Sequence, residues 1–256
     1  MRTVSRVDYD AIAHLYDGQP HRDKTADPEP RTFLVRRAAT SRLSILDIAC
    51  GTGNQIAANR LLAPDALFVG LDRSLGMLRQ AQTKMPHGFW VHADGSVLPF
   101  QSESFDFVTC QFAFHHIPDK AGMLRAAFRV LRRDGRLVMR NLCPQAHPDW
   151  IYYDYFPEAH ALDLEDFWPH ETIATTMEAI GFAAVSVELE HLHVEQDLRA
   201  WLDTVRRRDT NSQLMAISDR AYDAGLRRLE HELSEQGTPR TRVDHLCLLT
   251  VRGDKP

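Results

Sequence analysis

The sequence predicts an α/β fold organised around a doubly wound, mostly parallel sheet. Short apolar runs that end in glycines or in an acid alternate along the chain with segments that carry a helical stripe of apolar residues. Three such runs lie at 45–48, 67–71 and 104–110. Runs this short and this apolar are typical of parallel strands buried on both faces. The chain of 256 residues can bury one large core with a small appended subdomain.

The first apolar run ends in a glycine-rich turn. Ala49, Cys50, Gly51, Thr52 and Gly53 follow the strand, and a helix is expected from residue 54 to 62. Glycines without a Cβ allow unusual dihedral angles and let a ligand lie against bare backbone. A dinucleotide fingerprint needs a third glycine where this chain has Ile56, so a nicotinamide cofactor is disfavoured.

The same stretch resembles the first motif of the class I S-adenosylmethionine (SAM) dependent methyltransferases, a hydrophobic strand with an acid followed by G-x-G-x-G. Asp47 is the acid here, and Ala49 stands in place of the first glycine. The resemblance implies a Rossmann-like, seven-stranded sheet that is mostly parallel with an antiparallel last strand. It also implies SAM as cofactor and S-adenosyl-L-homocysteine as product.

The next two strands support this assignment. The run 67–71 ends on Asp72, about twenty residues past the glycines, where an acid can accept hydrogen bonds from both ribose hydroxyls. Ser74 is the expected N-cap of a helix that reaches Met85. A third strand, 89–93, precedes Asp94 and Gly95, which by the resemblance contact the adenine.

The fourth strand, 104–110, matches the family's S-F-D-hydrophobic pattern, and Gln111 to Ile117 lie at its carboxyl end. Ligands of open parallel sheets bind outside the carboxyl ends of the strands, where all four strands finish. The resemblance predicts the following cofactor-binding residues: Tyr9, Asp47, Ala49, Gly51, Gly53, Asp72, Arg73, Met77, Asp94, Gly95 and Gln111.

Residues 1–30 are expected to form a lid helix and a mobile loop. Tyr9, Ile12, Ala13 and Tyr16 make one apolar helix face, and 18–30 is polar and proline-rich. The segment resembles the Y-D-x-x-A-x-x-Y-D opening of the methyltransferase branch that includes the ubiquinone and menaquinone biosynthesis enzymes. In that branch it caps the cofactor and lines the substrate pocket. The alternative is a helix that merely packs on the sheet.

The SAM-binding core is expected to span 31–145. A helix through Leu124 and Leu131 should close at 133–135 with Gly135 as its left-handed cap, before a fifth strand at 136–139. The run RVLRRDGRLVM resembles the family's RVLKPGG segment.

An aromatic-rich segment, 146–170, follows the fifth strand. Its rings suggest the walls of a pocket for an aromatic, apolar or cationic substrate. The alternative is a hydrophobic cluster under a long loop. Residues 171–256 should complete the sheet, with a helix ended by Gly181, strands at 183–189 and 246–251, and a helical cap inserted at about 195–237.

The implied reaction is in-line displacement of the SAM methyl group by a small-molecule acceptor held at near-attack distance. A base is needed only for a protonated acceptor, and histidine can serve near neutral pH. Candidate catalytic residues are His115, His116 and Tyr16; candidate substrate-binding residues are Tyr16, His116, Asn141, Tyr152, Tyr153, Tyr155 and Arg207. The alternatives are a cyclisation or elimination on SAM itself, a nicotinamide-dependent oxidoreductase, and a non-catalytic nucleotide-binding module.

Composition limits the remaining possibilities. A net charge of −5 with only local arginine clusters disfavours nucleic acid as a partner. No apolar run has the length of a membrane span and no signal-peptide core stands at residues 1–8, so we expect a cytoplasmic protein, monomer or homodimer, with no membrane partner. The four cysteines form no C-x-x-C pair and no histidine stands at ligand spacing, so buried thiols and no metal site are expected.

Overall fold

The computed structural model of the chain describes residues 6–19, 22–37, 42–147, 149–235 and 240–256. The chain divides into two compact units. The first contains Met1–Asn141, His170–Glu188 and Thr250–Pro256, and the second contains Leu142–Pro169 and Leu189–Leu249. Within the described ranges, no helix combines the length and the apolar character needed to cross a membrane.

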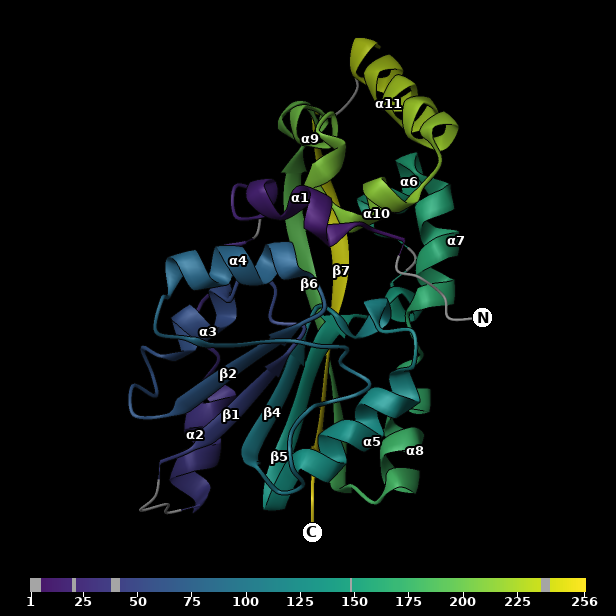
Figure 1. Cartoon of the computed structure of the whole chain (residues 1–256). Coiled ribbons are helices and arrows are strands. Elements are labelled where there is room, and N and C mark those ends of the chain that lie inside the picture. Colours follow the sequence, from purple (N-terminus) through teal and green to yellow (C-terminus); the bar gives the residue numbers. More distant parts are fainter. Residues whose placement is uncertain (1–5, 20–21, 38–41, 148, 236–239) are drawn as a thin grey trace. The chain divides into compact units, whose positions relative to one another are not determined.

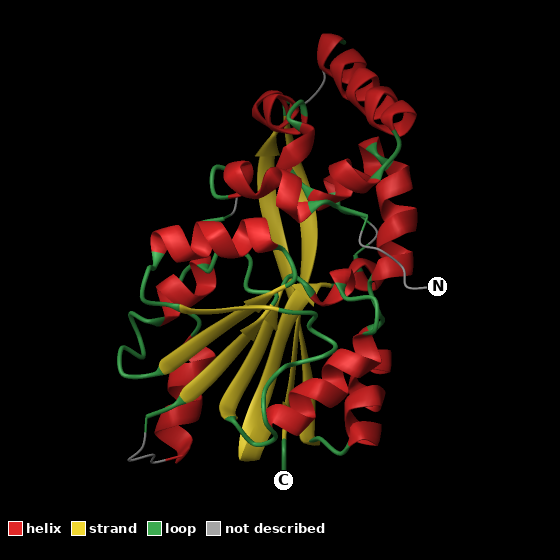
Figure 2. Ribbon diagram, viewed as in Figure 1, coloured by secondary structure: helices red, strands yellow, loops and turns green. Residues whose placement is uncertain are grey.

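The described residues contain a seven-stranded sheet in the order β3-β2-β1-β4-β5-β7-β6 (Figure 2). Its strands are β1 Ser44–Ile48, β2 Leu67–Asp72, β3 Phe89–His92, β4 Phe105–Gln111, β5 Leu131–Leu142, β6 Ala183–Asp197 and β7 Thr241–Asp254. The pairs β1–β2, β1–β4, β2–β3 and β4–β5 are parallel. β7 runs antiparallel beside β5: Asp134 N–H donates to Lys255 O at 2.8 Å, and Lys255 N–H donates to Gly135 O at 2.8 Å. The predicted fold class is confirmed.

The helices of the first unit surround this sheet (Figure 1). They are α1 Tyr9–Tyr16, α2 Pro28–Arg37, α3 Asn54–Asn59, α4 Leu75–Lys84, the short 3-10 helix η1 Phe114–His116, α5 Lys120–Val130 and α8 His170–Ile180. Ser74 caps α4 as predicted, because its hydroxyl accepts from Met77 N–H at 3.1 Å. Asp8 and Asp119 cap α1 and α5 in the same way. In the core, Phe33 of α2 meets Phe107 of β4 edge to face, with 5.6 Å between ring centroids.

Two local predictions are wrong. The loop expected over 18–30 is shorter, because α2 begins at Pro28, and proline suits the first turn of a helix; residues 20–21 lie outside the described residues. The helix cap expected at Gly135 is absent from this segment, because α5 ends at Val130 and β5 begins at Leu131. The left-handed residue is Asp134, with φ of 58°.

The second unit is mainly helical. It contains η2 Pro144–Ala146, α6 Ile151–Tyr155, α7 Pro157–Asp166, α9 Leu198–Val205, η3 Arg208–Thr210, α10 Ser212–Ala216 and α11 Asp219–Ser234. The insert expected at about 195–237 contains helices between Leu198 and Ser234, whereas its first residues, 195–197, belong to β6. The aromatic segment 146–170 is not a loop: it forms η2, α6 and α7, and its rings pack around Trp201. The structure thus favours a hydrophobic cluster for these rings.

A testable consequence concerns Gly225, where α11 packs on α6. A Cβ there would lie 2.7 Å from the carbonyl oxygen of Tyr155 and would overlap the ring of Phe156. We expect Gly225→Ala to lower the free energy of unfolding by about 1–3 kcal/mol through overpacking, although alanine is the better helix former. Chemical denaturation measures this. The control is Ala224→Gly at the exposed neighbouring position. It should lower the free energy of unfolding by about 1 kcal/mol through the poorer helix propensity of glycine alone. A more stable Gly225→Ala protein would contradict the packing described.

Candidate active site

The glycine turn after β1 has alternate residues in the left-handed region. Ala49, Gly51 and Gly53 have φ of 56°, 55° and 76°. Position 53 requires glycine for two reasons. Its φ lies in the left-handed region, and an added Cβ would lie 2.6 Å from the Trp90 ring. A Cβ at Gly51 would meet nothing closer than the ring of Tyr16 at 4.0 Å, so the space beside this peptide is open. Ala49 adopts the conformation at a cost of roughly 1–2 kcal/mol.

The carboxylate of Asp72 joins this turn to the beginning of α4. One oxygen accepts from Gly51 N–H at 2.8 Å and the other from Ser74 N–H at 2.8 Å. Asp72 is buried, and burial raises its pKa, while the two backbone donors act in the opposite direction. The two carboxyl ends of β1 and β2 are therefore held at a fixed separation by one side chain.

Asp47 is a buried acid at the end of β1. Burial, followed by the charges of Asp72 and Asp27, raises its pKa to about 8, and Lys24 offsets this only in part. The side chain of Asp27 accepts from Gln111 Nε2 at 2.7 Å. Asp47 is thus protonated at neutral pH, and a cation placed beside it would favour its ionisation. Strongly shifted carboxyl groups of this kind are common at functional sites.

α1 packs across the N-terminus of α4. Asp10 Oδ1 accepts from Ser74 Oγ at 3.0 Å and from Gly76 N–H at 2.6 Å. A Cβ at Gly76 would lie 3.1 Å from the Cβ of Ala13, so the glycine permits the close approach of the two helices. The helix predicted as a lid is therefore docked on α4.

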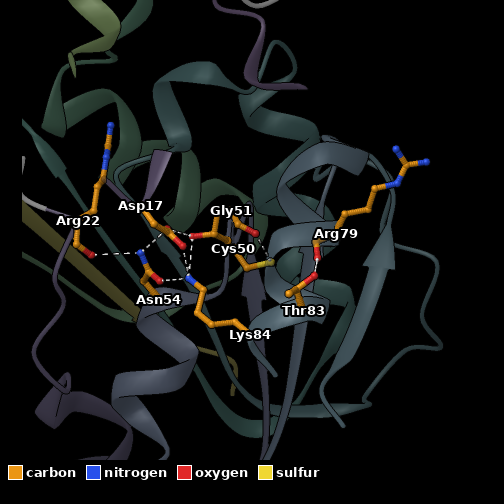
Figure 3. Close-up of polar contacts among 9 residues, drawn as sticks. Asp17, Arg22, Cys50, Gly51, Asn54, Arg79, Thr83 and Lys84 are labelled. Atoms are coloured by element: carbon orange, nitrogen blue, oxygen red, sulfur yellow. Dashed lines mark hydrogen bonds and ion pairs between the residues drawn. The ribbon is translucent and has the colours of Figure 1, made fainter. Parts of the chain in front are cut away.

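The C-terminal end of α1 is tied to the glycine turn (Figure 3). Asp17 accepts from Thr52 Oγ1 at 2.5 Å and from Asn54 Nδ2 at 2.9 Å, and it pairs with Lys84 Nζ at 2.6 Å. Asn54 Nδ2 also donates to the Arg22 carbonyl oxygen at 3.2 Å. These contacts hold the chain around residue 17 against the turn that carries the glycines.

Two histidines lie at the carboxyl end of β4. Burial, followed by the charges of Arg73 and Lys120, lowers the pKa of His116 to about 3. The Tyr9 hydroxyl and His116 Nε2 are 2.7 Å apart, and a neutral imidazole that accepts there makes Tyr9 the donor. Burial also lowers the pKa of His115, which hydrogen-bonds with Asn141. Both imidazoles are neutral at pH 7.

The first unit brings most of the predicted residues together at the strand ends. Asp94 is exposed, and its Oδ1 accepts from both Ser96 N–H and Ser96 Oγ, while Gly95 packs beside Ile48. Met77 is buried in α4 and Arg73 is exposed at the end of β2.

The remaining predicted substrate residues belong to the second unit. Tyr153 and Tyr155 donate to Asp163 and Glu232 at 2.7 and 2.8 Å, and Tyr152 hydrogen-bonds with Asn211. Arg207 is exposed and pairs with Asp209 at 3.2 Å. Each of these side chains thus has a partner inside its own unit.

Sequence reasoning missed the polar residues that fix the lid. They are Asp10, Asp17, Thr52, Asn54 and Lys84. A signal for two of them was present, because Asp10 and Asp17 are the acids of the Y-D pairs in the N-terminal motif. The other three could not be paired with residue 17 before the fold was known.

Comparison with known proteins identifies the family. A model described as a methyltransferase domain matches residues 46–139. A demethylmenaquinone methyltransferase of Streptomyces griseus is 34% identical over 206 residues, which cover 68% of this chain and 87% of that protein. The chain belongs to the SAM-dependent methyltransferase family. SAM is the cofactor of this family, and the nicotinamide and non-catalytic interpretations are therefore set aside.

Two further similarities agree with this assignment. A demethylmenaquinone methyltransferase of Thermotoga maritima is 39% identical over 100 residues, so the match spans 39% of this methyltransferase and 44% of that relative. The phosphoethanolamine N-methyltransferase 2 of Haemonchus contortus, solved with SAM, matches with a TM-score of 0.60 and 18% identity. The match covers 99% of this chain and 60% of that one, and at this identity it shows the fold.

The raised pKa of Asp47 predicts how stability depends on pH. Between its unfolded value near 3.8 and its folded value of about 8, the folded state binds a proton that the unfolded state does not. Wild-type stability therefore falls as pH rises through this window, by up to about 1.4 kcal/mol per pH unit. Asp47→Asn lacks this proton. We expect the variant to gain stability relative to the wild type from pH 4 to pH 8 in denaturation curves.

The control for this prediction is Asp65→Asn, which removes the same charge from an exposed position. Its difference from the wild type should vary little with pH. Parallel pH curves for wild type and Asp47→Asn would show that Asp47 has an ordinary pKa.

Proposed function

We propose that this methyltransferase methylates a small, hydroxylated aromatic acceptor of the quinone class, bound beside Tyr9 and His116. The observation that carries the proposal is the 2.7 Å contact between Tyr9 Oη and His116 Nε2 at the carboxyl end of β4. The rings of Tyr16 and His115 lie next to this pair, with centroids 6.3 Å from Tyr9 and 3.8 Å from His116. Such rings suit a flat acceptor. The relatives named as demethylmenaquinone methyltransferases support the same acceptor class.

The residues at the glycine turn fit SAM. Gly51 leaves open space beside its peptide, and Asp72 stands at the tip of β2 where a carboxylate can accept hydroxyl donors. The acidic pair Asp47 and Asp72 suits a cationic ligand, because a positive charge beside these carboxyl groups favours their ionised form. When bound, SAM supplies a methyl group activated by its sulfonium.

The protein residues have positioning roles in this proposal. A neutral imidazole with a pKa near 3 is a weak base, and its acceptor nitrogen is engaged by the Tyr9 hydroxyl, so His116 acts as a positioning residue that orients this hydroxyl. The Tyr9 oxygen is then free to accept a hydrogen bond from the hydroxyl of the methyl acceptor. Burial raises the pKa of Tyr16, which therefore stays protonated and remains a donor.

The lid must move for ligands to enter. Residues 9–17 are held across the turn because Asp10 accepts a hydrogen bond from α4 and Asp17 accepts hydrogen bonds from Thr52 and Asn54. Opening breaks these contacts and the Tyr9–His116 contact together, and closing excludes water from the acceptor. The contacts that fix the position of α1 therefore support a lid role for this helix.

Two expectations from the sequence remain predictions. A cytoplasmic location is supported by four free thiols, which are typical of a reducing compartment. A monomer or a homodimer is expected in solution.

The acceptor class is tested by mass spectrometry of reaction mixtures. We expect S-adenosylhomocysteine to form with dihydroxynaphthalenes or related quinols, and the acceptor to gain one methyl group. Primary amines and SAM alone serve as controls and should give no product. If SAM is consumed without an acceptor, a cyclisation or elimination on SAM is the reaction instead. Turnover with amines only would contradict the acceptor class.

Tyr9→Phe tests the placement of the acceptor. A buried polar group that loses its hydrogen-bond partner costs about 1–3 kcal/mol, so kcat/KM for the acceptor should fall by roughly 5- to 150-fold. The affinity for SAM, measured by calorimetry, should change little. Tyr222→Phe, which removes a phenol bonded to the Val205 carbonyl in the second unit, is the matched control. A Tyr9→Phe protein that loses SAM affinity but keeps kcat would place Tyr9 on the cofactor.

A further inference from the structure

The second unit contains a group of histidines and cysteines that methyl transfer does not use. Among the residues that the structure describes, His147, His191 and Cys247 are the group whose potential metal-ligand atoms all lie within 4.8 Å of one another. The sequence indicated no metal site because these residues are far apart along the chain; His147 and His191 are separated by 44 positions. Their proximity arises from strand pairing.

Antiparallel pairing of β6 and β7 places four of the side chains on one face. His193 and His245 face each other across the two strands, with their Nδ1 atoms 2.9 Å apart. His191 lies two residues before His193 on β6, and Cys247 lies two residues after His245 on β7. Residues two apart on a strand share a face, so His191 and Cys247 form the next opposed pair.

The segment after β5 supplies the third ligand. Cys143 N–H donates to the Cys247 carbonyl oxygen at 2.9 Å, which fixes this segment beside β7. The 3-10 helix η2 then turns the chain, and the His147 ring hydrogen-bonds with Nδ1 of His191. Their ring centroids are 4.6 Å apart. Three separate segments therefore converge on one point.

We propose that His147, His191 and Cys247 bind one divalent transition-metal ion of the zinc class. One thiolate and two imidazoles are a common zinc donor set, and sulfur with nitrogen excludes the oxygen-preferring magnesium and calcium. Cys143, which hydrogen-bonds with the Cys247 side chain, is a candidate for a fourth ligand. The ion would join the segment after β5 to β7 and β6 and stabilise the second unit.

Cobalt titration of the full chain tests the proposal. After the protein is stripped with a chelator, we expect one equivalent of Co²⁺ to produce visible bands of a tetrahedral site and a sulfur-to-cobalt charge-transfer band. Zn²⁺ should remove both signals by displacing the cobalt. Zinc at a hundredfold excess over its dissociation constant should also raise Tm by roughly 5 °C. A wild-type protein without the charge-transfer band would overturn the proposal.

Ligand variants make the test specific. His191→Ala changes an exposed residue and should weaken Co²⁺ binding at least tenfold, while Cys247→Ser should abolish the charge-transfer band. Cys247 is buried, so if its variant fails to fold by circular dichroism, His191→Ala decides. The matched control, His231→Ala, removes an exposed histidine of α11 in the same unit and should bind cobalt as the wild type does. Equal binding by His191→Ala and wild type would contradict the assignment.

Discussion

The site of the first unit depends on the carboxylate of Asp72. Its two oxygens accept from Gly51 and Ser74, so a single side chain fixes both the turn after β1 and the start of α4. The Ser74 hydroxyl in turn caps α4 and donates to Asp10 of the lid. A chain of hydrogen bonds therefore runs from the glycine turn through Asp72 and Ser74 to α1. Because these hydrogen bonds form one connected network, displacement of Asp72 would alter the positions of the glycine turn, α4 and α1.

Electrostatics complement this hydrogen-bond chain. Asp47 lies buried beside Asp72 and Asp27, and Lys24 acts against their combined charge. Burying like charges costs free energy unless a proton or a cation compensates. The raised pKa of Asp47 indicates that a proton on its carboxyl group compensates here. A cation beside this carboxyl group would favour its ionised form.

The part of the fold that could be predicted is the part whose strands, turns and helix caps are marked by residues close together in the sequence. The buried strands β1, β2 and β4 read as apolar runs, and the turn of Gly51 and Gly53 and the cap at Ser74 follow from residue chemistry. Asp134 was missed because aspartate tolerates the left-handed region that Gly135 was expected to occupy.

Other features depend on pairings between distant segments and could not be predicted. The phenols of Tyr153 and Tyr155 resemble pocket walls in the sequence, yet Asp163 and Glu232 satisfy them within the second unit. The proximity of His191 and Cys247 requires the register of β6 on β7.

The most direct test of the account is calorimetric binding of SAM to wild type and Asp72→Asn. The amide has nearly the shape of the carboxylate, but one of its two acceptor oxygens becomes a donor, so it cannot accept from both Gly51 and Ser74. We predict SAM binding at least tenfold weaker than in the wild type, which corresponds to about 1.4 kcal/mol, with Asp65→Asn unchanged. Equal affinities for wild type and Asp72→Asn would contradict the central role of this carboxylate.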